Sequence, residues 1–219
     1  ELPARFRRLS YNDALNTYGC DKPDLRFDLP LRDVNDLAQK SSFATFKDIV
    51  ANGGYVKAIC APKTEGVDFS RKYITELEEA AKIYGAQGLA WIKVGENKSL
   101  SGGVSKFFGG LEAELLDRLE ADEGDMILFV AHQNWKKCCA SLSAVRTKLG
   151  KDLNLIRKGF EFCWIIDFPL FEYNEAGGHW EAAHHMFSMP QAEYLDTLES
   201  DPGSVKGDLY DLVLNGYEV

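Results

Sequence analysis

The chain has 219 residues and a net charge of −9, and 45% of its residues are apolar and 27% charged. This composition is typical of a globular protein and excludes a disordered chain, while the acidic charge argues against a surface that attracts nucleic acid everywhere. The longest apolar runs, such as residues 126–131, are too short to cross a bilayer, and no signal core opens the chain, so we expect a cytoplasmic protein without a membrane partner.

The first predicted element is a short helix near the N-terminus. Ser10 can cap a helix that begins at Tyr11, and Gly19 can end it. The segment that follows, DKPDLRFDLP, is bracketed by Pro23 and Pro30, and proline disfavours helix for the residue before it. We interpret this segment as an extended connector between two units.

Residues 33–155 have the pattern of a self-contained α+β domain. Their order is β-β-α-β-β-α-β-α, which predicts helices packed on one sheet. Ser70 can cap one helix and Gly85 end it, and Gly150 can end another. The predicted strands are residues 43–49, 55–61, 89–94, 104–108 and 126–131, and the predicted helices are residues 70–84, 111–119 and 135–149.

The third block begins near Gly159. FCWIIDFPLF predicts a strand ending at Pro169, and NEAGGHW predicts a hairpin loop before a second strand at 180–184. After a polar stretch, residues 210–219 have the pattern of a strand that ends in NGYEV. Because the chain starts without Met and stops inside a patterned stretch, we expect an internal piece of a longer protein.

His184 and His185 are the first candidate site residues. Adjacent side chains on a strand face opposite ways, so at most one of them points into a given pocket. An isolated pair of this kind is also common as a structural or surface feature. No further ligands stand at zinc-like spacing, so the pattern does not predict a zinc site.

Asp211 and Glu218 are the second candidate pair. A gap of seven residues on an extended chain reverses the facing of the side chain, so the strand must bend if both carboxylates serve one cation, and Gly216 permits a bend. Two carboxylates together with phosphate oxygens and water suit Mg²⁺. The alternative is a solvated acidic face.

Three further sequence patterns give weaker evidence for a functional site. The five cysteines are scattered and form no CxxC pair, which predicts neither disulfides nor zinc. SLSGGVSKF at 99–107 matches no known phosphate-binding loop. The basic stretch at 136–158 suits either phosphate contact or a solvated helix face that offsets the acidic run before it.

Taken in order, these segments resemble bacterial-type aspartyl-tRNA synthetases of class II. The resemblance lies in IIDFPLFEYNEAGGHWEAAHHMFSMP and DPGSVKGDLYDLVLNGYEV, in LSYNDALNTYGCDKPDLRFDLPLRDVNDL upstream, and in a middle block similar to their GAD insertion domain. It implies an α+β chain in which the GAD domain (33–155, a mixed sheet with helices) is flanked by two partial segments of an antiparallel catalytic domain, residues 1–32 and 156–219.

The resemblance also assigns roles to the candidates. His184 and His185 match a pair that recognises aspartate, Glu218 matches an ATP-binding acid, and Asp211 and Glu218 match acids that hold Mg²⁺. The implied reaction joins aspartate and ATP to aspartyl-adenylate, then charges tRNA(Asp), in a homodimer. The family has proline after the two histidines where this chain has Met186.

Several family motifs have no counterpart in these residues, including the motif with an ATP-binding arginine. We therefore expect these 219 residues alone not to form aspartyl-adenylate. Two alternatives stay open: a GAD-containing tRNA-binding module like that of a tRNA-dependent amidotransferase subunit, and a structural spacer without a ligand.

Overall fold

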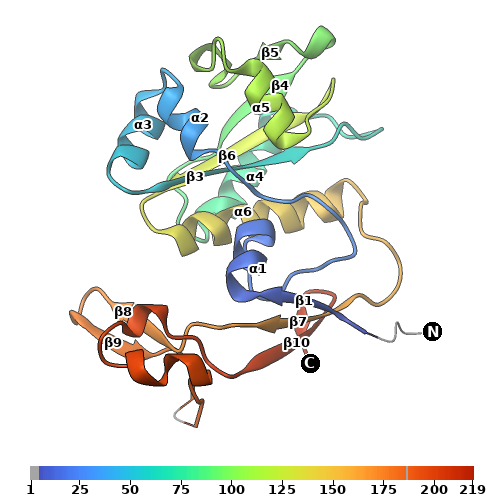
Figure 1. Cartoon of the computed structure of the whole chain (residues 1–219). Helices are drawn as coiled ribbons and strands as arrows, with labels where there is room; N and C mark the ends of the chain where they lie inside the picture. Colours follow the sequence, from blue (N-terminus) through green and yellow to red (C-terminus); the bar gives the residue numbers. More distant parts are fainter. Residues whose placement is uncertain (1–4, 186) are drawn as a thin grey trace. The chain divides into compact units, whose positions relative to one another are not determined.

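The computed structural model describes residues 5–185 and 187–219, which form two compact units (Figure 1). The smaller unit combines residues 5–14 with Asp21–Leu25 and Gly159–Val219, and the larger combines Leu15–Cys20 with Arg26–Lys158. The predicted α+β class is confirmed. Among the described residues, no helix is both long and apolar enough to cross a membrane.

The larger unit is a five-stranded sheet in the order β2-β3-β6-β4-β5, with helices around it. Every described pairing in this sheet is antiparallel, so the predicted mixed sheet is wrong in this respect. Its strands are β2 (Arg32–Asp33), β3 (Tyr55–Ala61), β4 (Ala90–Val94), β5 (Leu100–Ser101) and β6 (Met126–His132). Its helices are α2 (Asn35–Lys40), α3 (Ala44–Ala51), α4 (Arg71–Lys82), α5 (Glu112–Leu119) and α6 (Trp135–Asp152), with 3₁₀ turns at η1 (Glu96–Lys98) and η2 (Ser105–Phe107).

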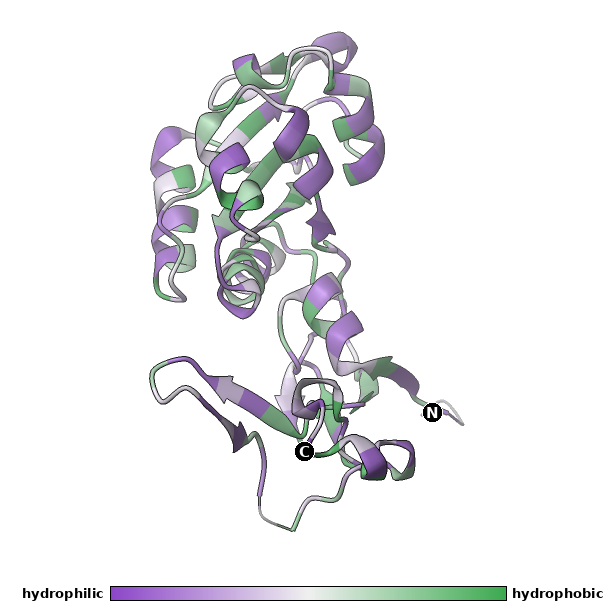
Figure 2. Ribbon diagram, turned by 60° about the vertical axis from the view of Figure 1, so that its left-hand side comes forward, coloured by the Kyte–Doolittle hydropathy of each residue, from purple (hydrophilic) through white to green (hydrophobic). Residues whose placement is uncertain are grey.

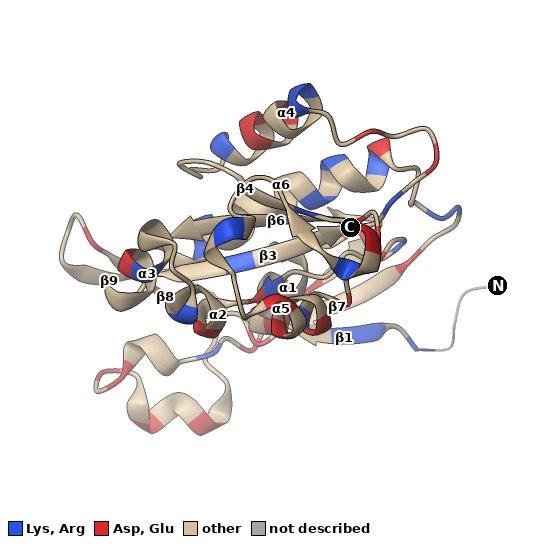
Figure 3. Ribbon diagram, turned by 90° about the horizontal axis from the view of Figure 1, so that it is seen from above, with Lys and Arg blue, Asp and Glu red and all other residues tan. Residues whose placement is uncertain are grey.

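Both faces of this sheet are buried, and each has its own hydrophobic core. Alternate residues of a strand point to opposite faces, so Leu128 and Val130 of β6 join the core under α4 and α6, whereas Ile127 and Phe129 join the core under α2, α3 and α5. Figure 2 shows the apolar residues gathered in these central strands and Figure 3 shows few charges on them. A double core of this kind makes the larger unit the more extensively packed part of the described chain.

Several predicted elements of the larger unit are confirmed, and three are wrong. The Oγ of Ser70 accepts a hydrogen bond from the amide of Tyr73 and caps α4 as predicted. Residues 43–49 are not a strand, because α3 covers most of them, and residues 104–108 contain a 3₁₀ turn. Helix α6 does not stop at Gly150 but continues to Asp152.

The smaller unit is built on a four-stranded sheet in the order β1-β7-β10-β11. β1 pairs with β7 in parallel, and the other pairings of this sheet are antiparallel. Helix α1 (Tyr11–Tyr18) begins in this unit and ends in the larger one. The strands are β1 (Arg7–Ser10), β7 (Phe162–Ile166), β8 (Phe171–Asn174), β9 (His179–Ala182), β10 (Tyr210–Leu214) and β11 (Tyr217–Glu218), with 3₁₀ turns at η3 (Ala192–Thr197) and η4 (Pro202–Ser204).

In α1 and the smaller unit the predicted cap, turn and hairpin are present, but β7 ends at Ile166 and not at Pro169 as predicted. The Oγ of Ser10 accepts from the amide of Asp13 at 3.1 Å, and Gly19, with φ +81°, follows the end of α1. β8 and β9 form the predicted hairpin, although β9 ends at Ala182 and does not include His184. The larger unit contains all of residues 33–155, but the three-part division of the chain into domains stays a prediction.

Candidate functional site

Strands β10 and β11 bring the two candidate carboxylates to the same face of the smaller sheet. Asn215 and Gly216 have φ values of 52° and 90°, which is typical of the two-residue Asn-Gly turn that closes a tight hairpin. Val213 lies opposite Glu218 in this hairpin. Because Asp211 is two residues before Val213, its side chain is on the same face as Glu218. The predicted bend is therefore wrong: a reversal of the chain, not a bulge, offsets the seven-residue gap.

Asp211 is half-buried in the central strand β10, opposite Ile165 of β7. Burial raises the pKa of the Asp211 carboxyl above its usual value, and the carboxylate of Glu218 raises it further. The charges of Lys22 and His184 act in the opposite direction. The structure thus gathers Asp211, Glu218 and His184 into one electrostatic environment.

Lys22 is a member of this environment that sequence reasoning missed. Its Nζ lies 2.6 Å from Oε2 of Glu218. The hydrogen bond to Glu218 is the largest cause of a raised pKa for Lys22, and the charges of Asp21 and Asp211 add to it. Lys22 lies between Asp21 and Pro23 in the segment interpreted only as a connector, and no local pattern links it to Glu218.

The two histidines have different surroundings. His184 is half-buried, and its ring packs edge-on against the buried Phe168, with 5.3 Å between the ring centroids. His185 is exposed and stacks on Phe187 at 5.2 Å. Of the two histidines, His184 is the one that contributes to the electrostatics of Asp211. Met186 lies outside the described residues.

The acid pair can supply part of the coordination sphere of a divalent cation. Among the residues that the structure describes, no group of three or more His, Cys, Asp or Glu side chains is arranged to hold a metal ion. Asp211 and Glu218 offer oxygen ligands on one face, and Mg²⁺ commonly takes one or two carboxylates and completes its octahedron with water and phosphate oxygens. These two residues therefore fit a Mg²⁺ ion whose remaining ligands are water or phosphate oxygens.

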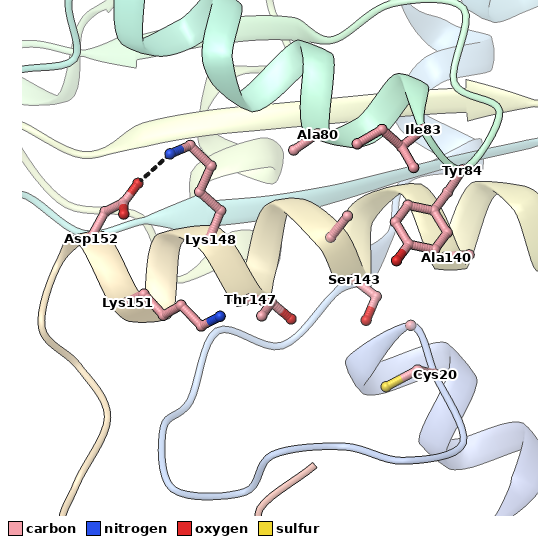
Figure 4. A pocket seen from close by; sticks show the side chains of 12 residues that line it. Cys20, Ala80, Ile83, Tyr84, Ala140, Ser143, Thr147, Lys148, Lys151 and Asp152 are labelled. Carbon is pink, nitrogen blue, oxygen red and sulfur yellow. Dashed lines mark ion pairs between the residues drawn. The ribbon is translucent and has the colours of Figure 1, made fainter. Parts of the chain in front are cut away.

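A separate groove lies in the larger unit, beside α6 (Figure 4). Its volume is about 500 Å³. Of the two lysines that line it, Lys148 pairs with Asp152 at 2.8 Å and with Glu76 at 3.7 Å. None of the predicted site residues lines this groove, which is formed by Gly19, Cys20, Ala80, Ile83, Tyr84, Ala140, Ser143, Ala144, Thr147, Lys148, Lys151 and Asp152.

The other sequence patterns have structural explanations. Arg146 of the basic stretch is buried, and it donates hydrogen bonds to the carbonyls of Phe27 and Leu29 at 2.8 and 3.1 Å. In the glycine loop, a Cβ at Gly103 would lie 1.8 Å from the carbonyl oxygen of Trp91, so close packing alone requires glycine there. The five cysteines are free thiols.

Residues 46–142 match the GAD domain. The chain is 57% identical over its whole length to an "Aspartate--tRNA(Asp/Asn) ligase" of Treponema denticola, and 43% identical to one of Borreliella burgdorferi. It is 48% identical to an "Aspartate--tRNA ligase" of Macrococcus caseolyticus. In each case the chain spans about 37% of the relative's length.

Proposed function

The chain belongs to the aspartate–tRNA ligase family as a segment that includes the GAD domain, and on that premise we propose that the protein it comes from activates aspartate with ATP and transfers it to tRNA(Asp). The observation that carries the proposal is the placement of Asp211 and Glu218 on one face of the smaller sheet, since the resemblance assigns these two residues to Mg²⁺ and ATP. His184, which the resemblance assigns to aspartate, contributes to the electrostatics of Asp211.

The proposed reaction needs charge neutralisation more than covalent catalysis by the protein. The α-carboxylate of aspartate attacks the α-phosphorus of ATP, the bond to the bridging oxygen breaks, and pyrophosphate leaves with that oxygen. Asp211 and Glu218 would hold the Mg²⁺ that neutralises the phosphate oxygens. The half-buried imidazole of His184 would donate a hydrogen bond to a carboxylate of aspartate. His185 is the weaker candidate for this role, because it is exposed and stacks on Phe187.

Aspartate-dependent exchange of pyrophosphate into ATP by the full-length protein tests the proposal. We expect Glu218→Gln to lower the exchange rate by about 10²-fold or more, the range for losing a group that stabilises transition-state charge. Glu193→Gln, an exposed acid on η3, is the control and should leave exchange unchanged. Exchange that does not depend on aspartate, or that survives in Glu218→Gln, would refute the assignment. The 219-residue chain alone should show none.

The relatives suggest a broader tRNA substrate range. Those from Treponema and Borreliella carry names that include both tRNA(Asp) and tRNA(Asn). We propose that this protein also charges tRNA(Asn), in the cytoplasm and as a homodimer. Aspartylation of purified tRNA(Asn) by the full-length protein tests the substrate range, and sedimentation of that protein tests the homodimer.

The amidotransferase-type alternative has less support. A GAD module alone accounts for residues 46–142, but the similarity to the ligases extends over the whole chain. His184, Asp211 and Glu218 all lie outside the matched GAD range.

A further inference from the structure

The backbone around Lys22 lies against the turn of the β10–β11 hairpin. A Cβ at Gly216 would lie 3.4 Å from Cβ of Asp24 and 3.8 Å from the carbonyl oxygen of Lys22. Gly216 also has a φ of +90°, a backbone conformation that residues with a Cβ rarely adopt. This close approach brings the start of the Lys22 side chain beside the hairpin that carries both carboxylates.

The ammonium of Lys22 is the positive charge that the structure places beside the acid pair. It lies 2.6 Å from Glu218, and the charges of Asp21 and Asp211 also act on it. A lysine ammonium is a compact point charge with donors only, so it meets the same electrostatic demand of a carboxylate cluster as a metal ion does.

This ion pair is weak enough to exchange. The side chains of Lys22 and Glu218 are 42% and 50% exposed. Exposed pairs of this kind change an equilibrium by at most about fivefold, and the flexible stem of lysine lets the ammonium move away at little cost. A divalent cation at the acid pair would oppose the ammonium by charge repulsion.

We propose that Lys22 is the internal counter-ion of the Asp211–Glu218 pair, and that Lys22 and a divalent cation are alternative partners of Glu218. This inference rests on the proposed function in one respect, since it takes the acid pair to be a cation site. On this account Lys22 is a positioning residue. Its ammonium pairs with the Glu218 carboxylate until a divalent cation binds there and displaces it.

Binding of Mn²⁺ to the 219-residue chain, followed by electron paramagnetic resonance without ATP or aspartate, tests the inference. We expect Lys22→Met to bind Mn²⁺ about two- to fivefold more tightly than the unmodified chain, the range given by an exposed ion pair. Lys22→Arg keeps the charge and should bind like the unmodified chain. Lys206→Met, a change of the same kind in the same unit, should also have no effect.

The inference would be overturned by equal or weaker binding in Lys22→Met, by the same gain in Lys22→Arg, or by no Mn²⁺ binding in any variant. The double variant Lys22→Met/Glu218→Gln should lose the gain, and its retention would place the cation elsewhere. Circular dichroism of each variant checks folding. Because the assay contains no nucleotide, its failure leaves pyrophosphate exchange as an independent test of the proposed function.

Discussion

Asp211 is a carboxyl group whose ionisation the fold opposes. Burial and the nearby charge of Glu218 raise the pKa of Asp211, so the folded chain binds this proton more tightly than the unfolded chain does. By thermodynamic linkage, protonation of Asp211 favours the native state. The free energy of unfolding therefore falls as pH rises from the unfolded-state pKa of about 3.9 through the raised folded-state pKa.

We therefore predict that Asp211→Asn removes a destabilising charge. At pH 7 the free energy of unfolding should equal or slightly exceed that of the unmodified chain, and the difference between the two should vanish near pH 3.5. Urea denaturation across this pH range measures the effect. Asp208→Asn, at an exposed position of the same unit, is the control. A variant that is less stable than the unmodified chain at pH 7 would contradict this account.

The candidate site could be predicted in part from single residues. The four predicted residues are chemically apt, and the structure gathers Asp211, Glu218 and His184. Lys22 could not be predicted, because its contact with Glu218 joins segments far apart in the sequence and no local pattern encodes that contact. The same-face geometry also depends on the hairpin turn at Asn215–Gly216, so the prediction of one strand over residues 210–219 was wrong.

At the level of elements, Gly150 shows why a helix can continue through glycine. A Cβ at this position would lie 2.6 Å from the ring of Phe27, so glycine is present for close packing and not as a stop. We predict that Gly150→Ala lowers the free energy of unfolding by about 1–3 kcal/mol through overpacking, although alanine favours helix by about 1 kcal/mol.

Thermal or urea unfolding measures this change, and Gly109→Ala is the matched control. A Cβ at Gly109 meets nothing within 4 Å, so alanine there should be neutral or slightly stabilising. If the two variants behaved alike, the close approach to Phe27 would not be what requires glycine at 150.

The errors in predicted elements have local physical causes. In residues 43–49, aromatic and β-branched residues favoured a strand, yet Phe43, Phe46 and Ile49 recur every three residues, which suits the helix that forms. Phe46 is buried in the core under α2, α3 and α5, so tertiary packing supports that helix. Strands β3 and β6 were predictable because their apolar runs are buried on both faces, and β4 because its apolar residues Ile92 and Val94 share one buried face.

At the scale of the molecule, the larger unit has the features of an independent folding unit. It has a complete sheet and two cores, and most of its residues form one continuous stretch. We predict that residues 15–158 alone unfold cooperatively on heating, with a single transition by far-ultraviolet circular dichroism.

The matched comparison is residues 159–219 alone, which lack β1 and the segment of Lys22. Because β7 then has an unpaired edge, this piece should show no cooperative transition. A cooperative transition in this piece, or none in residues 15–158, would reverse the assignment of the two units.

The parallel pairing of β1 with β7 has a consequence for biosynthesis. Arg7 of β1 lies opposite Cys163 of β7, so the first strand leaves the ribosome long before its partner exists. At about 5–20 residues per second, the wait is roughly 8–30 s. During that time the larger unit can complete its core while β1 remains a bare edge. The exposed charges of Arg7 and Arg8 would protect β1 during this interval, because charged edge strands resist pairing with another chain.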